Sequence, residues 1–164
     1  SGEEAWYRIL ARELRLYQLR HRRRLSTGGA AKLLSHMLHP FKGTELCVTA
    51  SLCGRWRICG PRVIYVCSDG LRLQGELFSV GSGSPYAYSI LDSSVYWGMS
   101  VQEATAVARE AVYRATYRDA YSGNNVDLYH VTAKGWRRRE RENLKEEYYR
   151  EKERERKRVA ERDT

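Results

Sequence analysis

The polar side chains with the clearest potential for chemistry are Asp119 and Ser122, which follow a long segment with a helical pattern. Apolar residues recur at helical spacing over residues 101–115, so Asp119 falls in the last turn of the predicted helix. A carboxylate at that end opposes the helix dipole, which makes Asp119 a candidate functional acid. The alternative is an ordinary helix end at which Asp119 pairs with Arg118 or Arg114.

The residues after Asp119 predict a corner between a helix and a strand. Gly123 is placed to take the left-handed conformation that ends many helices. Residues 126–131 then alternate between apolar and polar types, as a strand does. We therefore expect Asp119 and Ser122 to lie together at this corner.

Two other groups have residue types that bind metals, but their spacing argues against a site. His36 and His39 lie three residues apart on a predicted helix, with no matching acid or cysteine nearby. None of the cysteines forms the C-x-x-C pair typical of zinc sites. The cysteines are Cys47, Cys53, Cys59 and Cys67. We expect no metal and no cofactor.

The glycine-rich segment Gly81–Pro85 precedes a predicted helix, as a phosphate-binding loop does. It lacks the lysine of such loops. Ser84 suits the helix cap and Pro85 the first helical turn, so the segment predicts a tight strand-to-helix connection.

The elements that position these residues are a mixture of helices and strands. Helical periodicity and caps predict helices over 6–19, from Ser26 or Thr27 to Pro40, over 86–91 and from the capping box Ser100–Glu103 onward. Alternation and turn residues predict strands over 45–53, 63–66, 71–80 and 126–131, and from Trp136 onward, with a turn from Arg55 to Arg62 through Gly60-Pro61. The first three strands form a meander, and the class is α+β.

Length and charge predict one domain with a tail. The 164 residues carry 29 Lys and Arg against 20 Asp and Glu, but residues 26–136 are nearly balanced. We expect a domain over 1–136 and a charged extension over 137–164, helical or disordered, in which Glu–Arg and Glu–Lys pairs four residues apart favour a helix. No stretch approaches the 18 apolar residues of a membrane span.

Several ordered motifs resemble one family. The motifs are Phe78–Ser84, Tyr86-Ala87-Tyr88 and Arg118–Gly123, together with Leu46-Cys47-Val48, Ser68-Asp69-Gly70 and Arg72–Gly75. With them the chain resembles the beta-type subunits of the proteasome core particle, in particular the chymotrypsin-like class with its immune and thymic relatives. The last three motifs point to the thymic relative. The resemblance runs from Trp6 to Trp136. The loop Gly54–Cys59 departs from it because the acid that the family carries there is missing.

The resemblance implies the fold and the activity. The fold would be the four-layer alpha-beta-beta-alpha sandwich of the amino-terminal nucleophile hydrolase type, with the first strands missing. The activity would be that of a threonine-type endopeptidase in proteasomal protein catabolism. By match to the family motif, Ser82, Asp119 and Ser122 support the terminal amine and the nucleophile.

The catalytic threonine of the family has no counterpart in these residues, so we expect the chain as given to be inactive. Ser1 stands directly before a helix rather than at the head of a strand, which is the wrong place for a terminal nucleophile. A fragment, a truncated gene product and a noncatalytic isoform all fit.

The resemblance also implies partners and a location. Other alpha and beta subunits in heptameric rings, a peptide or protein substrate, and the cytoplasm and nucleus are expected, with no membrane. The alternative function is a noncatalytic basic module that binds RNA or an acidic protein. Nucleic acid is disfavoured, because aromatic and basic residues do not interleave as they do on base-stacking surfaces.

Overall fold

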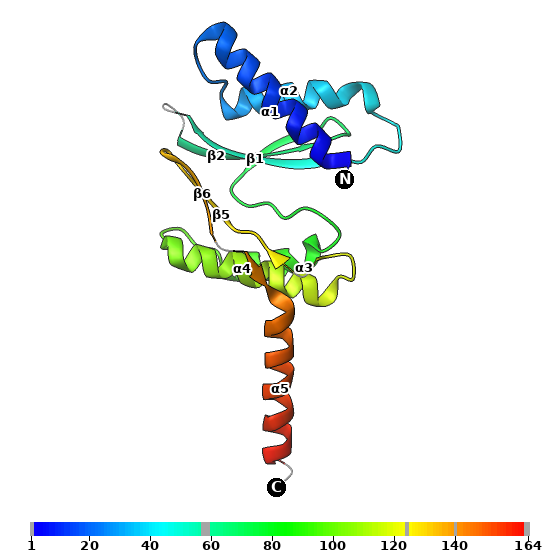
Figure 1. Cartoon of the computed structure of the whole chain (residues 1–164), viewed down its shortest axis with the longest axis vertical. Coiled ribbons are helices and arrows are strands. Elements are labelled where there is room, and N and C mark those ends of the chain that lie inside the picture. Colours follow the sequence, from blue (N-terminus) through cyan, green and yellow to red (C-terminus); the bar gives the residue numbers. More distant parts are fainter. Residues whose placement is uncertain (1, 57–59, 124, 140, 163–164) are drawn as a thin grey trace. The chain divides into compact units, whose positions relative to one another are not determined.

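The computed structural model describes residues 2–56, 60–123, 125–139 and 141–162, and it divides into two compact units (Figure 1). The first unit contains the chain up to Val80 together with residues 131–135, and the second contains residues 81–130 and 136–164. Ser1 and the part of the 54–59 loop at residues 57–59, including Cys59, lie outside the described residues. Each unit is described by itself.

Two helices open the first unit. Helix α1 spans Gly2–His21, and helix α2 spans Thr27–Leu38. Ser26 caps α2, because its Oγ accepts the N–H of Gly29 at 3.0 Å. A short 3-10 helix, η1 (His39–Phe41), follows and contains Pro40, so α2 ends where the sequence predicted.

The sheet of this unit is an antiparallel meander of three strands. They are β1 (Thr49–Trp56), β2 (Gly60–Cys67) and β3 (Arg72–Gly75). Leu52 lies opposite Ile64, and Tyr65 opposite Leu73. The turn from β2 to β3 passes through Gly70, whose φ of 92° is a conformation that favours glycine.

Helix α2 covers one face of this sheet (Figure 1). Leu34 and Leu38 are fully buried against Val48 and Val66, which have exposed fractions of 1% and 0%. The remaining members of this core are Leu10, Ala31, Ala50 and Ile64. The alternation predicted for the first strand is confirmed, since its other face carries the exposed residues Ser51 and Cys53.

Helices α3 (Ser84–Ser94) and α4 (Val101–Arg118) pack against each other in the second unit. They pack through small buried residues, which are Ala87, Ala111 and Ala115. The capping box predicted for α4 is confirmed: Ser100 Oγ accepts the N–H of Glu103, and the Glu103 carboxylate accepts the N–H of Ser100.

Short strands and a long helix complete the described chain. Strand β4 (Asn125–Val126) pairs with β7 (Glu142–Asn143), and β5 (Tyr129–Thr132) pairs with β6 (Gly135–Arg138). Helix α5 spans Leu144–Arg162.

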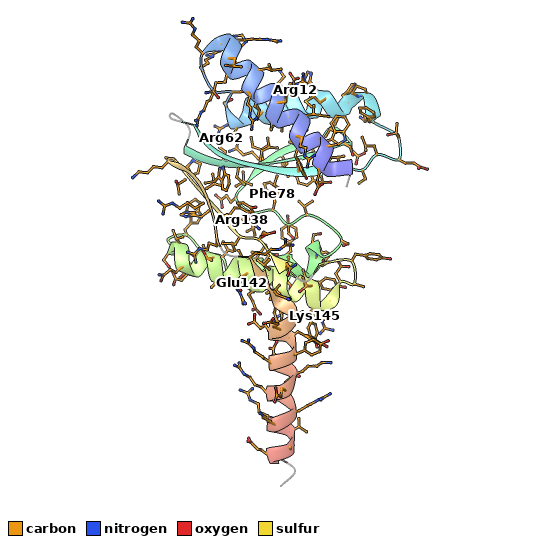
Figure 2. All side chains as sticks on the ribbon, viewed as in Figure 1. Arg12, Arg62, Phe78, Arg138, Glu142 and Lys145 are labelled. Carbon is orange, nitrogen blue, oxygen red and sulfur yellow. The ribbon has the colours of Figure 1, made fainter. Side chains whose placement is uncertain are left out.

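The first turns of α5 are held on α4. Leu144 is 2% exposed and packs with Tyr113 and Val126. Arg109 of α4 forms ion pairs with Glu142 and with Glu147 of α5. Glu142 is labelled beside α4 in Figure 2, where the side chains of the rest of α5 point away from the helix on all sides.

A hydroxyl contact between α4 and α5 lies one turn further along α5. The Tyr113 hydroxyl donates to Glu151 at 2.5 Å. Every described side chain after Glu151 in α5 is exposed. Within the charged extension, residues 144–162 are therefore helical, and the first two turns of this helix contact α4.

Three predicted boundaries are wrong. Residues 126–131 do not form one strand, because β4 ends at Val126 and β5 begins at Tyr129. Between these strands, Asp127 forms an ion pair with Arg138 at 2.5 Å. The strand predicted over 71–80 ends at Gly75, and the ring of Phe78, labelled in Figure 2, follows it. The ring centres of Phe78 and Tyr65 lie 5.9 Å apart in a stacked arrangement. Gly60 and Pro61, predicted in a turn, are the first residues of β2.

The mixture of helices and antiparallel strands confirms the α+β class. None of the described helices is both long enough and apolar enough to cross a membrane.

Candidate functional site at the end of helix α4

The site is centred on Asp119, the residue that caps the carboxyl end of α4. Its N–H still bonds the carbonyl of Ala115 at 2.8 Å, but its backbone is extended, with φ −103° and ψ 115°. The helix ends at Arg118, so Asp119 stands just past the last helical turn. The sequence pattern predicts it within that turn. Its side chain leaves the helix axis toward the start of α3.

Two serine hydroxyls donate to the same carboxylate oxygen. Ser82 Oγ and Ser122 Oγ each lie 2.6 Å from Asp119 Oδ2. The other oxygen, Oδ1, receives the N–H of Tyr121 at 3.4 Å, a long hydrogen bond. The three residues that the sequence singled out are thus brought into direct contact, and they are called the Ser82–Asp119–Ser122 cluster below.

Different parts of the chain supply the two serines. Ser122 follows Asp119 in a turn closed by its own N–H bonding the Asp119 carbonyl at 3.2 Å. Ser82 comes from the connection before α3, which is 37 residues away in the sequence. Gly81 turns that connection with a φ of 112°, a conformation that side chains disfavour.

The hydrogen bonds change the acidity of the carboxyl group. The hydroxyls of Ser122 and then Ser82 lower the pKa of Asp119 below its ordinary value, because each bond stabilises the charged form. Partial burial acts in the opposite direction and is outweighed. Asp119 is therefore ionised at neutral pH, and it serves as a hydrogen-bond acceptor rather than as a proton donor.

The alternative of an ordinary helix end does not match the contacts. Arg114 Nε bonds Glu110 at 2.7 Å, and the Arg118 guanidinium lies 5.4 Å from the ring centre of Tyr117. Neither arginine is the partner of Asp119, whose Oδ2 accepts the two serine hydroxyls.

Two local predictions around the site are wrong. Gly123 does not take the left-handed conformation, because α4 ends through the extended backbone of Asp119. Gly83, not Ser84, is the cap of α3, and it provides no side-chain hydrogen bond. Pro85 does stand in the first turn of α3, as predicted.

Metal-binding residues do not gather elsewhere in the described ranges. No three His, Cys, Asp or Glu side chains among these residues are placed to hold a metal ion. His36 and His39 are both exposed, and Cys47, Cys53 and Cys67 are free thiols.

Sequence reasoning missed the role of Gly83, which lies buried against the cluster. The sequence feature that could have indicated this role is the glycine between two serines in Ser82–Ser84. A glycine in such a place marks either a special backbone conformation or a close approach.

The fold is α+β, and its candidate site is a carboxylate that accepts two hydroxyl groups at a helix end. The proteasome subunit family matches residues 4–131, and the chain therefore belongs to that family. The match begins within α1 and ends within β5, and it includes the whole cluster.

The relatives that it resembles are beta-type subunits. The chain is 44% identical to proteasome subunit beta type-5-A of Arabidopsis thaliana over 144 residues, which cover 88% of this chain and 52% of that protein. It is 47% identical to proteasome subunit beta type-5 of Gallus gallus over 133 residues, or 81% of this chain and 52% of that protein. Proteasome subunit beta type-8 of Canis lupus familiaris is 44% identical over 131 residues, 80% of this chain and 47% of that protein. The chain spans about half the length of the curated relatives it matches.

Proposed function

We propose that the full-length protein containing this chain is a beta subunit of the proteasome core complex with chymotrypsin-like, threonine-type endopeptidase activity. The observation that carries the proposal is the Ser82–Asp119–Ser122 cluster, found in a chain whose relatives are named beta type-5 and beta type-8. The reaction would be peptide-bond hydrolysis in proteasomal protein catabolism.

In this proposal, Asp119 orients a nucleophile that comes from outside these 164 residues. Oδ2 is occupied by two hydroxyls, whereas Oδ1 accepts one long bond among the described residues. Oδ1 therefore retains acceptor capacity for the amine of a terminal threonine. An ionised carboxylate can hold such an amine in position and set its proton affinity, which is the supporting role in nucleophilic catalysis.

The partners and location follow from the same proposal. Other alpha and beta subunits, arranged in heptameric rings, would surround the subunit, and a peptide or protein would be the substrate. No cofactor or metal takes part. The cytoplasm and nucleus are the proposed sites of action.

The substitution Asp119→Asn tests the supporting role directly. In assembled particles that contain the full-length protein, we expect kcat for a peptide with a large apolar residue before the cleaved bond to fall on the order of 100-fold. The reason is that asparagine keeps the size of the side chain but loses the charge that orients the amine. Turnover and melting temperature are measured on the same particles.

Asp92→Asn is the matched control, because Asp92 is an exposed acid of α3. It should leave kcat unchanged. Unchanged turnover in Asp119→Asn, with a raised melting temperature, would instead indicate relief of an unfavourable helix dipole and would remove the supporting role. The isolated 164-residue chain should hydrolyse no peptide.

A further inference from the structure

Gly83 lies where a side chain would enter the cluster. A Cβ built on Gly83 would stand 2.8 Å from Ser122 Oγ, 3.1 Å from Ala115 Cβ and 3.3 Å from Asp119 Oδ2. Ordinary van der Waals contact begins at about 3.5 Å. All three neighbours belong to the end of α4 and the turn after it, so the absence of a side chain lets the start of α3 approach them closely.

The requirement at Gly83 is for space and not for backbone conformation. Its φ of −82° and ψ of 2° are open to residues with side chains. Gly81 is the contrasting case, because its φ of 112° needs glycine while a Cβ there would meet nothing within 4 Å. The two glycines of this connection therefore have separate roles.

A methyl group at position 83 would have to displace a member of the cluster. Ala115 is fixed on α4 and is 7% exposed, so it cannot move aside by rotation. Ser122 can rotate, but its hydroxyl would then leave Asp119 Oδ2, to which it now donates at 2.6 Å. If α3 moved instead, it would carry Ser82 away from the same oxygen, since Ser82 precedes Gly83 directly.

We propose that Gly83 is a positioning residue for the Ser82–Asp119–Ser122 cluster: its missing side chain lets both serine hydroxyls reach Asp119 Oδ2 together. The effect on catalysis rests on the function proposed above, whereas the effect on the cluster geometry does not. Gly83 touches no reacting atom and acts through Ser122 and Asp119.

The test is Gly83→Ala in the full-length protein, assembled into particles and examined by electron cryomicroscopy and by peptide hydrolysis. We expect Ser122 Oγ or Ser82 Oγ to leave hydrogen-bonding distance of Asp119. We expect kcat to fall on the order of 100-fold, the cost of a small misplacement near the reacting centre, with KM unchanged. Gly123→Ala is the matched control, because a Cβ there meets nothing within 4 Å and its φ is not left-handed. It should change neither readout.

A double-mutant cycle keeps the test decisive even if the Gly83→Ala subunit fails to assemble. In the Ser122→Ala background the atom at 2.8 Å is gone, so adding Gly83→Ala should cost little further turnover, and the double variant should assemble even if Gly83→Ala alone does not. Penalties that simply add would overturn the positioning role. So would an intact cluster in the Gly83→Ala particle, whatever its turnover.

The two proposals fail in different ways. A displaced hydroxyl with unchanged turnover would leave the positioning role of Gly83 standing and would contradict the catalytic role of the cluster. A displaced hydroxyl with reduced turnover, absent in Gly123→Ala, would support both.

Discussion

Asp119 accepts two hydroxyl hydrogen bonds on a single oxygen, and this local arrangement explains why an acid is tolerated at the negative end of a helix. The serine hydroxyls stabilise the negative charge of the carboxylate, which the helix dipole at this end disfavours. The same bonds keep its pKa below the ordinary value.

This pKa gives a pH prediction. A carboxyl whose folded pKa is lowered contributes stability that is fully present above its unfolded pKa of about 4 and is lost as the pH falls through the lower folded value. The variant Ser82→Ala/Ser122→Ala removes the cause of the shift, so its melting temperature should fall less than that of the parent chain as the solution is acidified below about pH 5.

Ser93→Ala is the control for this measurement, because Ser93 Oγ bonds carbonyls of its own helix, at Ser89 and Ile90. Its melting temperature should follow the parent's pH dependence. Parallel profiles for the parent and the double variant would contradict the assigned cause of the lowered pKa.

The proximity of Asp119 and Ser122 could be predicted from sequence because they are three residues apart at one helix end. Ser82 could not be placed in that way, since 37 residues separate it from Asp119 and no local pattern encodes the contact. Its place followed from the family resemblance. Gly83 was missed because close approach depends on how α3 packs against α4, which a single sequence does not state.

Elements with strong local signals formed where the sequence predicted them. The helix opened by Ser100 and Glu103 begins at its capping box, and the meander turns at Gly70. The failures were in short strands, whose limits depend on tertiary partners. Asp127, for example, lies between β4 and β5, and it forms an ion pair with Arg138 at the end of β6 that an alternating pattern does not encode.

The packing of α5 on α4 gives a prediction at the scale of elements. Leu144→Ala should destabilise the chain by about 2–4 kcal/mol, because it opens a cavity beside Tyr113 and Val126 in a fully buried site. Urea unfolding measures the change in the free energy of unfolding.

Val159→Ala on the same helix is the matched control. Val159 is 59% exposed, so its loss should change the free energy of unfolding by no more than about 0.5 kcal/mol. Equal, small effects at both positions would show that residues 137–164 are a separable extension, as the sequence predicted, and that the α4 contacts add little.

At the scale of the whole molecule, the alternative of a basic binding module rests on the charged ends of the chain. Acidic and basic side chains alternate along α5, and two pairs four residues apart form ion pairs, Glu146 with Arg150 and Glu153 with Lys157. Such pairing leaves a mixed-sign surface rather than the basic stripe of a nucleic-acid site. The proteasome family match favours the proposed role as a subunit instead.

The most direct test of the account is to express the full-length protein with a carboxyl-terminal tag, purify it under native conditions and identify its partners by mass spectrometry. We predict a particle of defined size that contains alpha and beta proteasome subunits and withstands moderate salt. A monodisperse monomer without these subunits, or salt-sensitive retention on nucleic acid in their place, would contradict the claim that this chain is part of a core-particle subunit.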